Sequence, residues 1–105
     1  MDKLYIISKG MMKRFPEGFE PFQIMTRVLE ECGEVANEVN HWENSGVKRQ
    51  KKGEPSKENL AKEVMQALRA LMQIVIYHGI ESEFELAIKS AFERLKSEGH
   101  IEEEW

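Results

Sequence analysis

Apolar residues follow the period of an α-helix in successive stretches of this chain. Between positions 25 and 39 they return every three or four residues, which places them on one helical face. From 64 to 80 the chain is apolar on nearly every side, as is typical of the most buried helix of a domain. Alternating β-branched residues and Asn-Gly or Asp-Gly turns are absent from the sequence. The pattern therefore predicts an all-α fold.

Prolines, glycines and polar clusters divide the 105 residues into four helices, which fit one domain over 1–105. We expect helices over about 2–14, 21–43, 56–79 and 82–99. Pro21 is a favoured first helical residue, and Gly79 is a favoured residue after a helix end. Ser82 with Glu85 three residues later matches a capping box for the last helix. Residues 44–55 are expected to form a polar loop, and residues 100–105 a loosely held tail.

The second predicted helix carries an uncompensated row of glutamates. Glu31, Glu34 and Glu38 project from one edge of its apolar face. No lysine or arginine occurs between Arg27 and Lys48 to offset them. Like charges three or four residues apart destabilise a helix by roughly 0.2–0.5 kcal/mol per pair. A solvated helix face usually alternates the two signs, and this face does not.

The third predicted helix supplies a polar strip that can face this row. The strip holds Glu63 and Gln66, together with Asn59, Gln73 and Tyr77. In an antiparallel hairpin, Glu31 lies ~16 Å before the turn and Glu63 ~11 Å after it, so the two groups reach nearly the same level. An unpaired buried carboxylate is costly, so Glu63 is expected to face a partner, a metal or water. Converging oxygen ligands of this kind suit Mg²⁺ or Mn²⁺.

The motif formed by these acids is similar to that of a known family. Glu30-Glu31-Cys32-Gly33-Glu34, followed after 28 residues by Glu63-Val64-Met65-Gln66, resembles the EExxE–ExxD signature of the MazG-like all-α nucleoside triphosphate pyrophosphohydrolases. The similarity spans roughly residues 22–95. The chain departs from the pattern at Gln66, where the family has an aspartate, and Asp2 is its only aspartate.

The resemblance implies a four-helix MazG-like bundle built on an antiparallel helical hairpin and assembled as a homodimer or homotetramer. It implies hydrolysis of a (deoxy)nucleoside triphosphate to the monophosphate and pyrophosphate. The apolar surface of the third helix also exceeds what three helices can cover. This too predicts assembly. We expect the subunit interface to include some of four α-helical residues, Leu68, Leu71, Met72 and Val75.

Site residues follow from the same resemblance. Glu31, Glu34, Glu63 and Gln66 are expected to hold Mg²⁺ or Mn²⁺, and Glu30 to orient or deprotonate water. For Gln66 the alternative is an amide bonded across the bundle. The expected substrate contacts are Lys48, Arg49, Lys51, Lys52, Trp42, Gln73 and Tyr77. The alternatives there are a solubilising loop for the basic residues, a buried or interface tryptophan, and hydrogen bonding at the edge of the core for Gln73 and Tyr77.

Composition argues against two classes of partner, and the partner that the resemblance implies is a nucleoside triphosphate or a related small phosphorylated ligand. A net charge of −4 argues against duplex nucleic acid, and the sequence lacks an apolar run long enough for a membrane helix. The single cysteine, Cys32, excludes an intrachain disulfide, is expected in the core, and favours the cytoplasm. Two alternatives to an enzyme are a weakened MazG-like module that binds a nucleotide or phosphorylated metabolite, and a helical interaction protein without a ligand.

Overall fold

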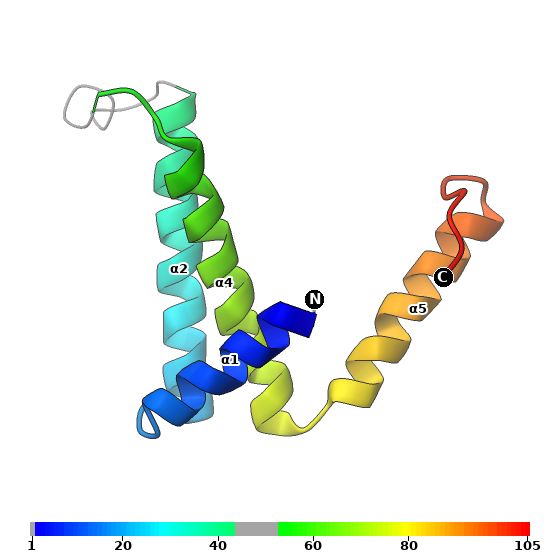
Figure 1. The fold of residues 1–105 in the computed structure, drawn as a ribbon, viewed down its shortest axis with the longest axis horizontal. Helices are drawn as coiled ribbons and strands as arrows, with labels where there is room; N and C mark the ends of the chain where they lie inside the picture. The colour runs from blue at the N-terminus through cyan, green and yellow to red at the C-terminus, as the bar shows by residue number, and fades with distance from the viewer. Residues whose placement is uncertain (1, 44–52) are drawn as a thin grey trace.

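The computed structural model describes residues 2–43 and 53–105, and within these ranges it contains four α-helices and no strand (Figure 1). The helices are α1 (Asp2–Arg14), α2 (Pro21–Trp42), α4 (Lys57–His78) and α5 (Glu81–Ser97). The predicted all-α class is confirmed, and so are the four helices, with boundaries within two residues of those expected. Most of the predicted polar loop lies outside the described residues.

The antiparallel pair of α2 and α4 forms the centre of the molecule, and the two helices lie side by side in Figure 1. Ile24 and Val28 of α2 pack with Ala70 of α4 in the buried core, and Phe19 and Ile74 pack against them. Fully burying a side chain such as Ile24 contributes about 1.5–3 kcal/mol. The expected helical hairpin is therefore present.

The first helix crosses α4 and packs through a small residue. Ser8 is fully buried, and its hydroxyl donates to the Leu4 carbonyl at 2.7 Å. The same hydroxyl lies 3.4 Å from the Arg69 carbonyl of α4, so a short polar side chain joins the two helices. A larger side chain at this position would hold the helices apart.

A left-handed glycine ends α4 and sets the start of α5. Gly79 has φ 62°, and its N–H donates to the Ile76 carbonyl while the Ile80 N–H donates to the Val75 carbonyl. These two bonds form a Schellman motif, which ends α4 and changes the direction of the chain directly after Gly79. The helix α5 therefore begins at Glu81, and Ser82 lies inside its first turn. The predicted capping box of Ser82 and Glu85 is wrong for this reason.

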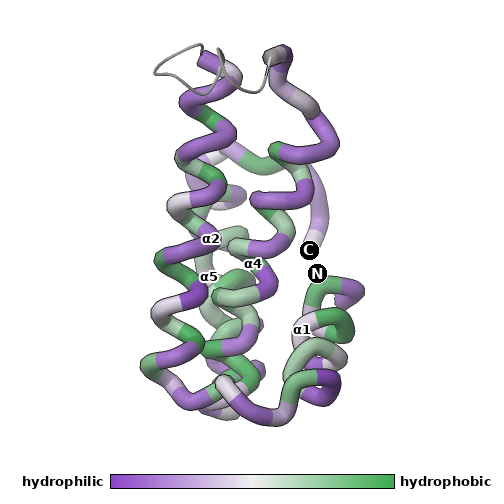
Figure 2. Tube along the Cα trace, turned by 90° about the vertical axis from the view of Figure 1, so that its left-hand side faces the viewer, coloured by the Kyte–Doolittle hydropathy of each residue, from purple (hydrophilic) through white to green (hydrophobic). Residues whose placement is uncertain are grey.

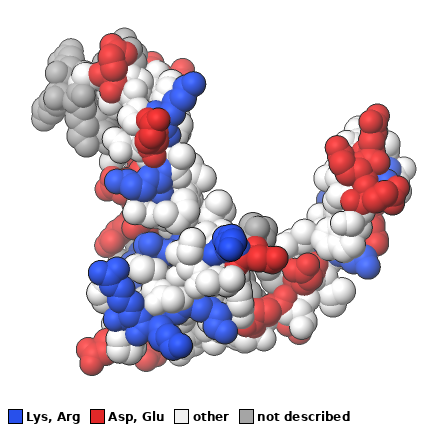
Figure 3. All heavy atoms as spheres, viewed as in Figure 1, with Lys and Arg blue, Asp and Glu red and all other residues white. Residues whose placement is uncertain are grey.

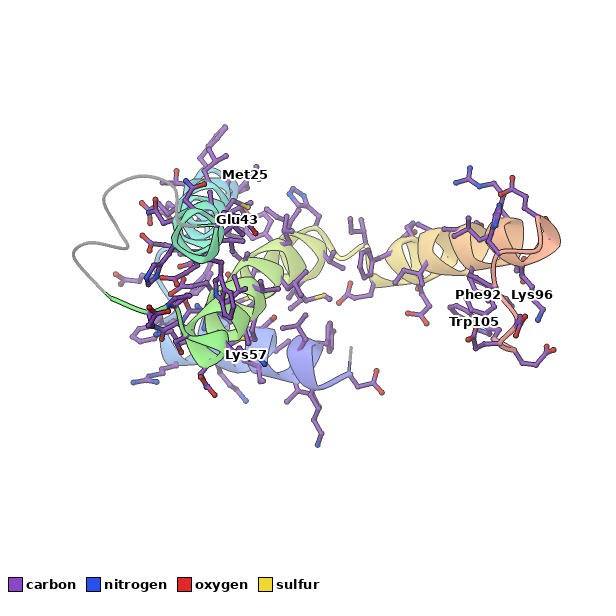
Figure 4. All side chains as sticks on the ribbon, turned by 90° about the horizontal axis from the view of Figure 1, so that it is seen from above. Met25, Glu43, Lys57, Phe92, Lys96 and Trp105 are labelled. Atoms are coloured by element: carbon purple, nitrogen blue, oxygen red, sulfur yellow. The ribbon has the colours of Figure 1, made fainter. Side chains whose placement is uncertain are left out.

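The last helix projects away from the hairpin. In Figure 1 α5 leaves the lower end of α4 as a separate arm, and the view from above in Figure 4 shows the same separation. No residue of α5 is buried within the chain. The four helices of one chain therefore do not close into a bundle.

The C-terminal residues fold back on α5. The Lys96 ammonium donates to the Glu102 carbonyl at 3.3 Å and the Glu103 carbonyl at 2.8 Å. The ring of Trp105 packs edge-on against Phe92, with centroids 5.3 Å apart (Figure 4). The expectation of a loosely held tail is wrong, because these contacts tie it to the helix.

Apolar and polar residues alternate along the helices, as Figure 2 shows, and part of the apolar surface stays exposed. Of the α4 residues expected at an interface, Leu68 and Leu71 are 45% and 46% exposed, whereas Met72 and Val75 are buried within the chain. Cys32 is exposed rather than in the core, which corrects that expectation. Among the described residues no helix has the length and apolar character needed to span a membrane.

Candidate functional site

A glutamine joins two glutamates across the hairpin. Glu31 of α2 and both Glu63 and Gln66 of α4 are half-buried. The Gln66 amide nitrogen donates to Glu31 Oε2 and to Glu63 Oε2, each at 3.3 Å. The amide orientation is assigned from its surroundings, because the opposite one would turn its oxygen toward carboxylate oxygens only. The structure thus brings together three of the four predicted metal ligands.

One antiparallel register explains this contact and a second one. The Tyr77 hydroxyl donates to Glu20 Oε2 at 3.3 Å. Tyr77 follows Gln66 by about eleven residues, and Glu20 precedes Glu31 by the same interval, as antiparallel helices require. The side chains of Glu31 and Gln66 share one flank of the hairpin because each follows the helical period from the buried contact line. Local helix geometry is therefore sufficient to assemble the three residues.

Glu31, Gln66 and Glu63 form a bridge between the two helices. This bridge is neutral at Gln66 and anionic at the two glutamates. Each carboxylate keeps further lone pairs available, since one oxygen of Glu31 and one of Glu63 accept from the same amide. An aspartate in place of Gln66 would instead put a third carboxylate beside those of Glu31 and Glu63. The glutamine therefore satisfies the two acids without adding a third negative charge.

The remaining predicted acids lie outside this bridge. Glu34 and Glu30 are exposed, although Glu34 falls opposite Glu63 in the hairpin register. In the part of the chain that the structure describes, no three His, Cys, Asp or Glu side chains come together as a metal-binding group. The expected set of Glu31, Glu34 and Glu63 is thus not assembled in this conformation.

The bridge fits a magnesium ion that arrives with a phosphate ligand. Mg²⁺ is commonly bound by one or two carboxylates, with substrate phosphates and water completing its shell. Glu31 and Glu63 supply two carboxylates, and a turn of the Gln66 amide would supply a carbonyl oxygen between them. The donor chemistry therefore suits Mg²⁺ or Mn²⁺ without a cage made only of protein side chains.

The predicted substrate contacts do not converge on the bridge. Lys48, Arg49, Lys51 and Lys52 lie outside the described residues. Trp42 and Tyr77 each lie about eleven residues along their helix from the bridge, or ~16 Å, at opposite ends of the hairpin. Gln73 is almost fully buried, at 3% exposure. Gln73 is thus buried in the hairpin and Tyr77 bonds to Glu20, and their role as substrate contacts stays a prediction.

Trp42 remains a distinct case. It is half-buried, and its indole Nε1 is enclosed with no hydrogen-bond partner among the described residues. A buried indole N–H without a partner is costly, so this atom marks a place where a further group or water is needed.

Two features apart from the bridge are not predicted from the sequence. His41 is buried, and its Nε2 donates to the Gly53 carbonyl at 2.6 Å, which fastens the far end of the interhelical connection to α2. Its Nδ1 lies 3.9 Å from the carboxylate of Glu38. Arg27, one turn before Glu31, stacks on the ring of Phe19 at 4.4 Å. The only sequence signal for the first feature is the i,i+3 spacing of Glu38 and His41.

Both tyrosines hold their protons more tightly than usual. Partial burial, and then the nearby Glu20 carboxylate, raise the pKa of the Tyr77 hydroxyl above 10.0. The hydrogen bond from Tyr5 to Glu81, 3.0 Å long, is the main cause that raises the pKa of Tyr5. Each hydroxyl therefore stays a neutral donor around neutral pH.

The site is a small, half-buried anionic group on one flank of a helical hairpin, built from Glu31, Glu63 and Gln66. Comparisons of this chain with protein-family models, characterised proteins and solved structures find no match.

Proposed function

We propose that this chain is a metal-dependent nucleoside triphosphate pyrophosphohydrolase, which converts a (deoxy)nucleoside triphosphate to the monophosphate and pyrophosphate. The observation that carries the proposal is the contact of the Gln66 amide with both Glu31 and Glu63, at 3.3 Å. One acid from each half of the EExxE–ExxQ motif thus accepts from the same amide, which supports the proposal. The resemblance of that motif to the MazG-like signature supplies the reaction.

Glu31, Glu63 and Gln66 would hold Mg²⁺ or Mn²⁺, with Glu34 one turn away on the same flank. When bound, the metal neutralises phosphate oxygens and lowers the pKa of a bound water. The exposed Glu30 carboxylate orients the attacking water and takes its proton. That water forms a bond to the α-phosphorus, the bond to the bridging oxygen breaks, and pyrophosphate leaves.

The proposal includes the wider setting that the resemblance implies. The protein would act in the cytoplasm as a homodimer or homotetramer. Lys48, Arg49, Lys51 and Lys52 would bind the phosphates from the segment between the two acidic helices. Exposure of Leu68 and Leu71 on α4 supports assembly, because each leaves apolar surface in water.

A second candidate is a nucleotide- or phosphometabolite-binding module of the same shape. It is favoured by Gln66 itself, whose neutral amide already satisfies both carboxylates. Such a site has one anionic ligand fewer than the family pattern and would hold a metal–phosphate complex with slow turnover or none.

A pyrophosphate-release screen separates the two candidates. It covers the nucleoside and deoxynucleoside triphosphates with Mg²⁺ and with Mn²⁺, and uses wild type, Glu63→Gln, and Glu93→Gln on α5 as a matched control. Release that Glu63→Gln abolishes and Glu93→Gln retains is the expected result. A nucleotide that raises the melting temperature only with metal, without release, would favour the binding module. If neither release nor stabilisation occurs, both are wrong.

A further inference from the structure

One face of α5 is apolar and only partly covered by its own chain. This α5 stripe consists of Ile80, Phe84, Ala87, Ile88, Ala91 and Leu95, which recur at helical spacing. Phe84 and Ile88 line a cavity of about 320 Å³ that also borders α1 and α4. A second, almost wholly apolar cavity of about 230 Å³ lies between Phe84 and Leu68.

The helix cannot rely on its own chain for stability. It has 17 residues, none of them buried. An isolated helix of this length is marginal in water, and most helical stability in proteins comes from packing an apolar face. The α5 stripe therefore requires a partner surface.

The first and last turns of α5 carry side chains of opposite charge. Glu81, Glu83 and Glu85 occupy its start, whereas Arg94 and Lys96 occupy its last turn. Figure 3 shows acidic atoms at both ends of the arm, and basic atoms gathered over α1. Glu93 and Glu98 flank the basic pair, so the complementarity of α5 with an antiparallel second copy lies in individual pairs such as Glu83 with Arg94.

The spacing of these charges fixes the register. Glu83 and Arg94 are eleven residues apart, or about three turns, so both lie on the same side of the stripe. Glu83 lies five residues before Ile88, and Arg94 lies five residues after Lys89. A twofold axis between Ile88 and Lys89 therefore brings each Glu83 opposite the partner's Arg94. A parallel pair would instead place Glu83 against the same residue of its partner.

We propose that α5 is a dimerisation arm through which two copies of this chain pair, antiparallel and stripe to stripe. The twofold axis passes near Ile88, and Glu83 faces the partner's Arg94 on each side. Neither Glu83 nor Arg94 forms an ion pair with a side chain in the described part of its own chain. The cavities at the start of α5 then lie beside the end of the partner's α5, whose apolar side chains they can receive. This interface does not depend on the proposed hydrolysis.

Sedimentation equilibrium of the full chain tests the register through charge exchange. Glu83→Arg and Arg94→Glu each replace two attractive contacts of the dimer by two repulsive ones. Each single variant should raise the dimer dissociation constant at least about tenfold. The double variant restores opposite charges and should return to within about threefold of wild type. Glu93→Arg, which changes the charge equally on the side of α5 away from the stripe, should have little effect.

Disulfide trapping tests the position of the axis. In a Cys32→Ser background, Ile88→Cys should form an intermolecular disulfide under mild oxidant, because position 88 faces its own copy across the axis. Leu86→Cys, 63% exposed on the opposite side of α5, is the matched control and should stay uncrosslinked. Circular dichroism verifies that each variant is helical.

Three results would overturn the proposal. They are a wild-type chain that stays monomeric across the micromolar range, single charge reversals that leave dimerisation unchanged, and cross-linking as fast at position 86 as at position 88. A persistent monomer would assign the α5 stripe to a helix of another protein.

Discussion

At the scale of single residues, Gln66 decides how the two acids of the site coexist. Its amide donates to Glu31 and Glu63 at the same distance, 3.3 Å, in a half-buried position. Two carboxylates this near to one another repel, and the amide offsets that repulsion by hydrogen bonds to charged acceptors. A cation between them would do so more strongly, so the same geometry suits a metal-free state and a metal-bound one.

Gln66→Asp should reverse the balance between these states. A third carboxylate removes the two hydrogen bonds and adds repulsion, so the metal-free protein should lose about 1–2 kcal/mol of stability. Mg²⁺ should then stabilise the variant more than wild type, because the site gains an anionic ligand. Melting curves with chelator and with Mg²⁺ measure both effects.

Gln66→Met serves as the control, since it removes the amide without adding charge. It should lose stability and gain no response to Mg²⁺. If Gln66→Asp and Gln66→Met respond alike to chelator and Mg²⁺, position 66 does not face a metal site.

The two tyrosines predict a loss of stability at alkaline pH. The pKa of Tyr5 and that of Tyr77 are both raised above 10.0 in the folded chain, chiefly by the hydrogen bond to Glu81 and by burial respectively. Between 10.0 and the raised value the folded state binds more protons than the unfolded state, so stability falls as pH rises through that window and is intact below it.

Tyrosinate absorbance measures this directly. The native protein should titrate at higher pH than the protein unfolded in urea. In each of the variants Tyr5→Phe and Tyr77→Phe, one tyrosine with a raised pKa should remain. Coincident native and unfolded curves would contradict the contacts to Glu81 and Glu20.

Sequence reasoning placed the three bridging residues because helix rise and period are nearly invariant. Once Glu31 and Gln66 belong to antiparallel helices joined by a loop of estimated length, their level and flank follow. Trp42 and Tyr77 are predicted at the site only because of their chemical type. The register of the hairpin puts them at its opposite ends, away from the bridge. The direction in which the Gln66 amide points depends on its neighbours, so the sequence alone does not decide between a metal ligand and a hydrogen bond across the bundle.

At the scale of helices, local signals were decisive at three boundaries and misleading at one. Pro21 begins α2, Ser56 caps α4 by accepting from the Asn59 N–H at 3.2 Å, and Gly79 ends α4. The start of α5 was misjudged because the Schellman bonds after Gly79 restart the helix earlier than the motif at Ser82 indicates. A terminal motif in the sequence competes with the geometry of the preceding turn, and here the turn prevails.

Gly79→Ala and Gly10→Ala should change stability in opposite directions. A Cβ at either position meets no atom within 4 Å, so packing is not affected. At Gly79 the left-handed backbone, φ 62°, makes alanine unfavourable by about 1 kcal/mol. At Gly10, inside α1, alanine should stabilise the helix by about 0.5–1 kcal/mol.

Urea denaturation of both variants at one protein concentration gives the comparison. Equal shifts in the same direction would mean that the Gly79 conformation does not contribute as described.

At the scale of the whole molecule, the sequence predicts assembly but does not show which surface would serve it. Helical periodicity shows which faces are apolar, yet it does not show which of them the chain covers itself. Met72 and Val75 are buried by their own chain, whereas the α5 stripe is only partly covered. The projection of α5 depends on the direction in which the chain leaves Gly79, and composition carries no information about that direction.

The arm therefore predicts unequal stability within one chain. α2 and α4 bury Ile24, Val28 and Ala70 against one another in every copy, so their amides should be protected from hydrogen exchange at any concentration. The helix α5 buries no residue of its own, so its protection should depend on a second copy. Exchange measured by mass spectrometry, above and below the dimer dissociation constant, should show α5 protection falling on dilution while α2 and α4 protection is unchanged.

The Glu83→Arg variant provides the control for this experiment at a single concentration. It should expose α5 amides where wild type protects them, without affecting the α2–α4 hairpin, because position 83 is exposed and distant from the Ile24 core. Protection of α5 that is the same at all concentrations and in Glu83→Arg would show that its own chain stabilises the arm. Protection lost from α2 and α4 together with α5 would instead show that the hairpin and the arm unfold as one unit that requires the dimer.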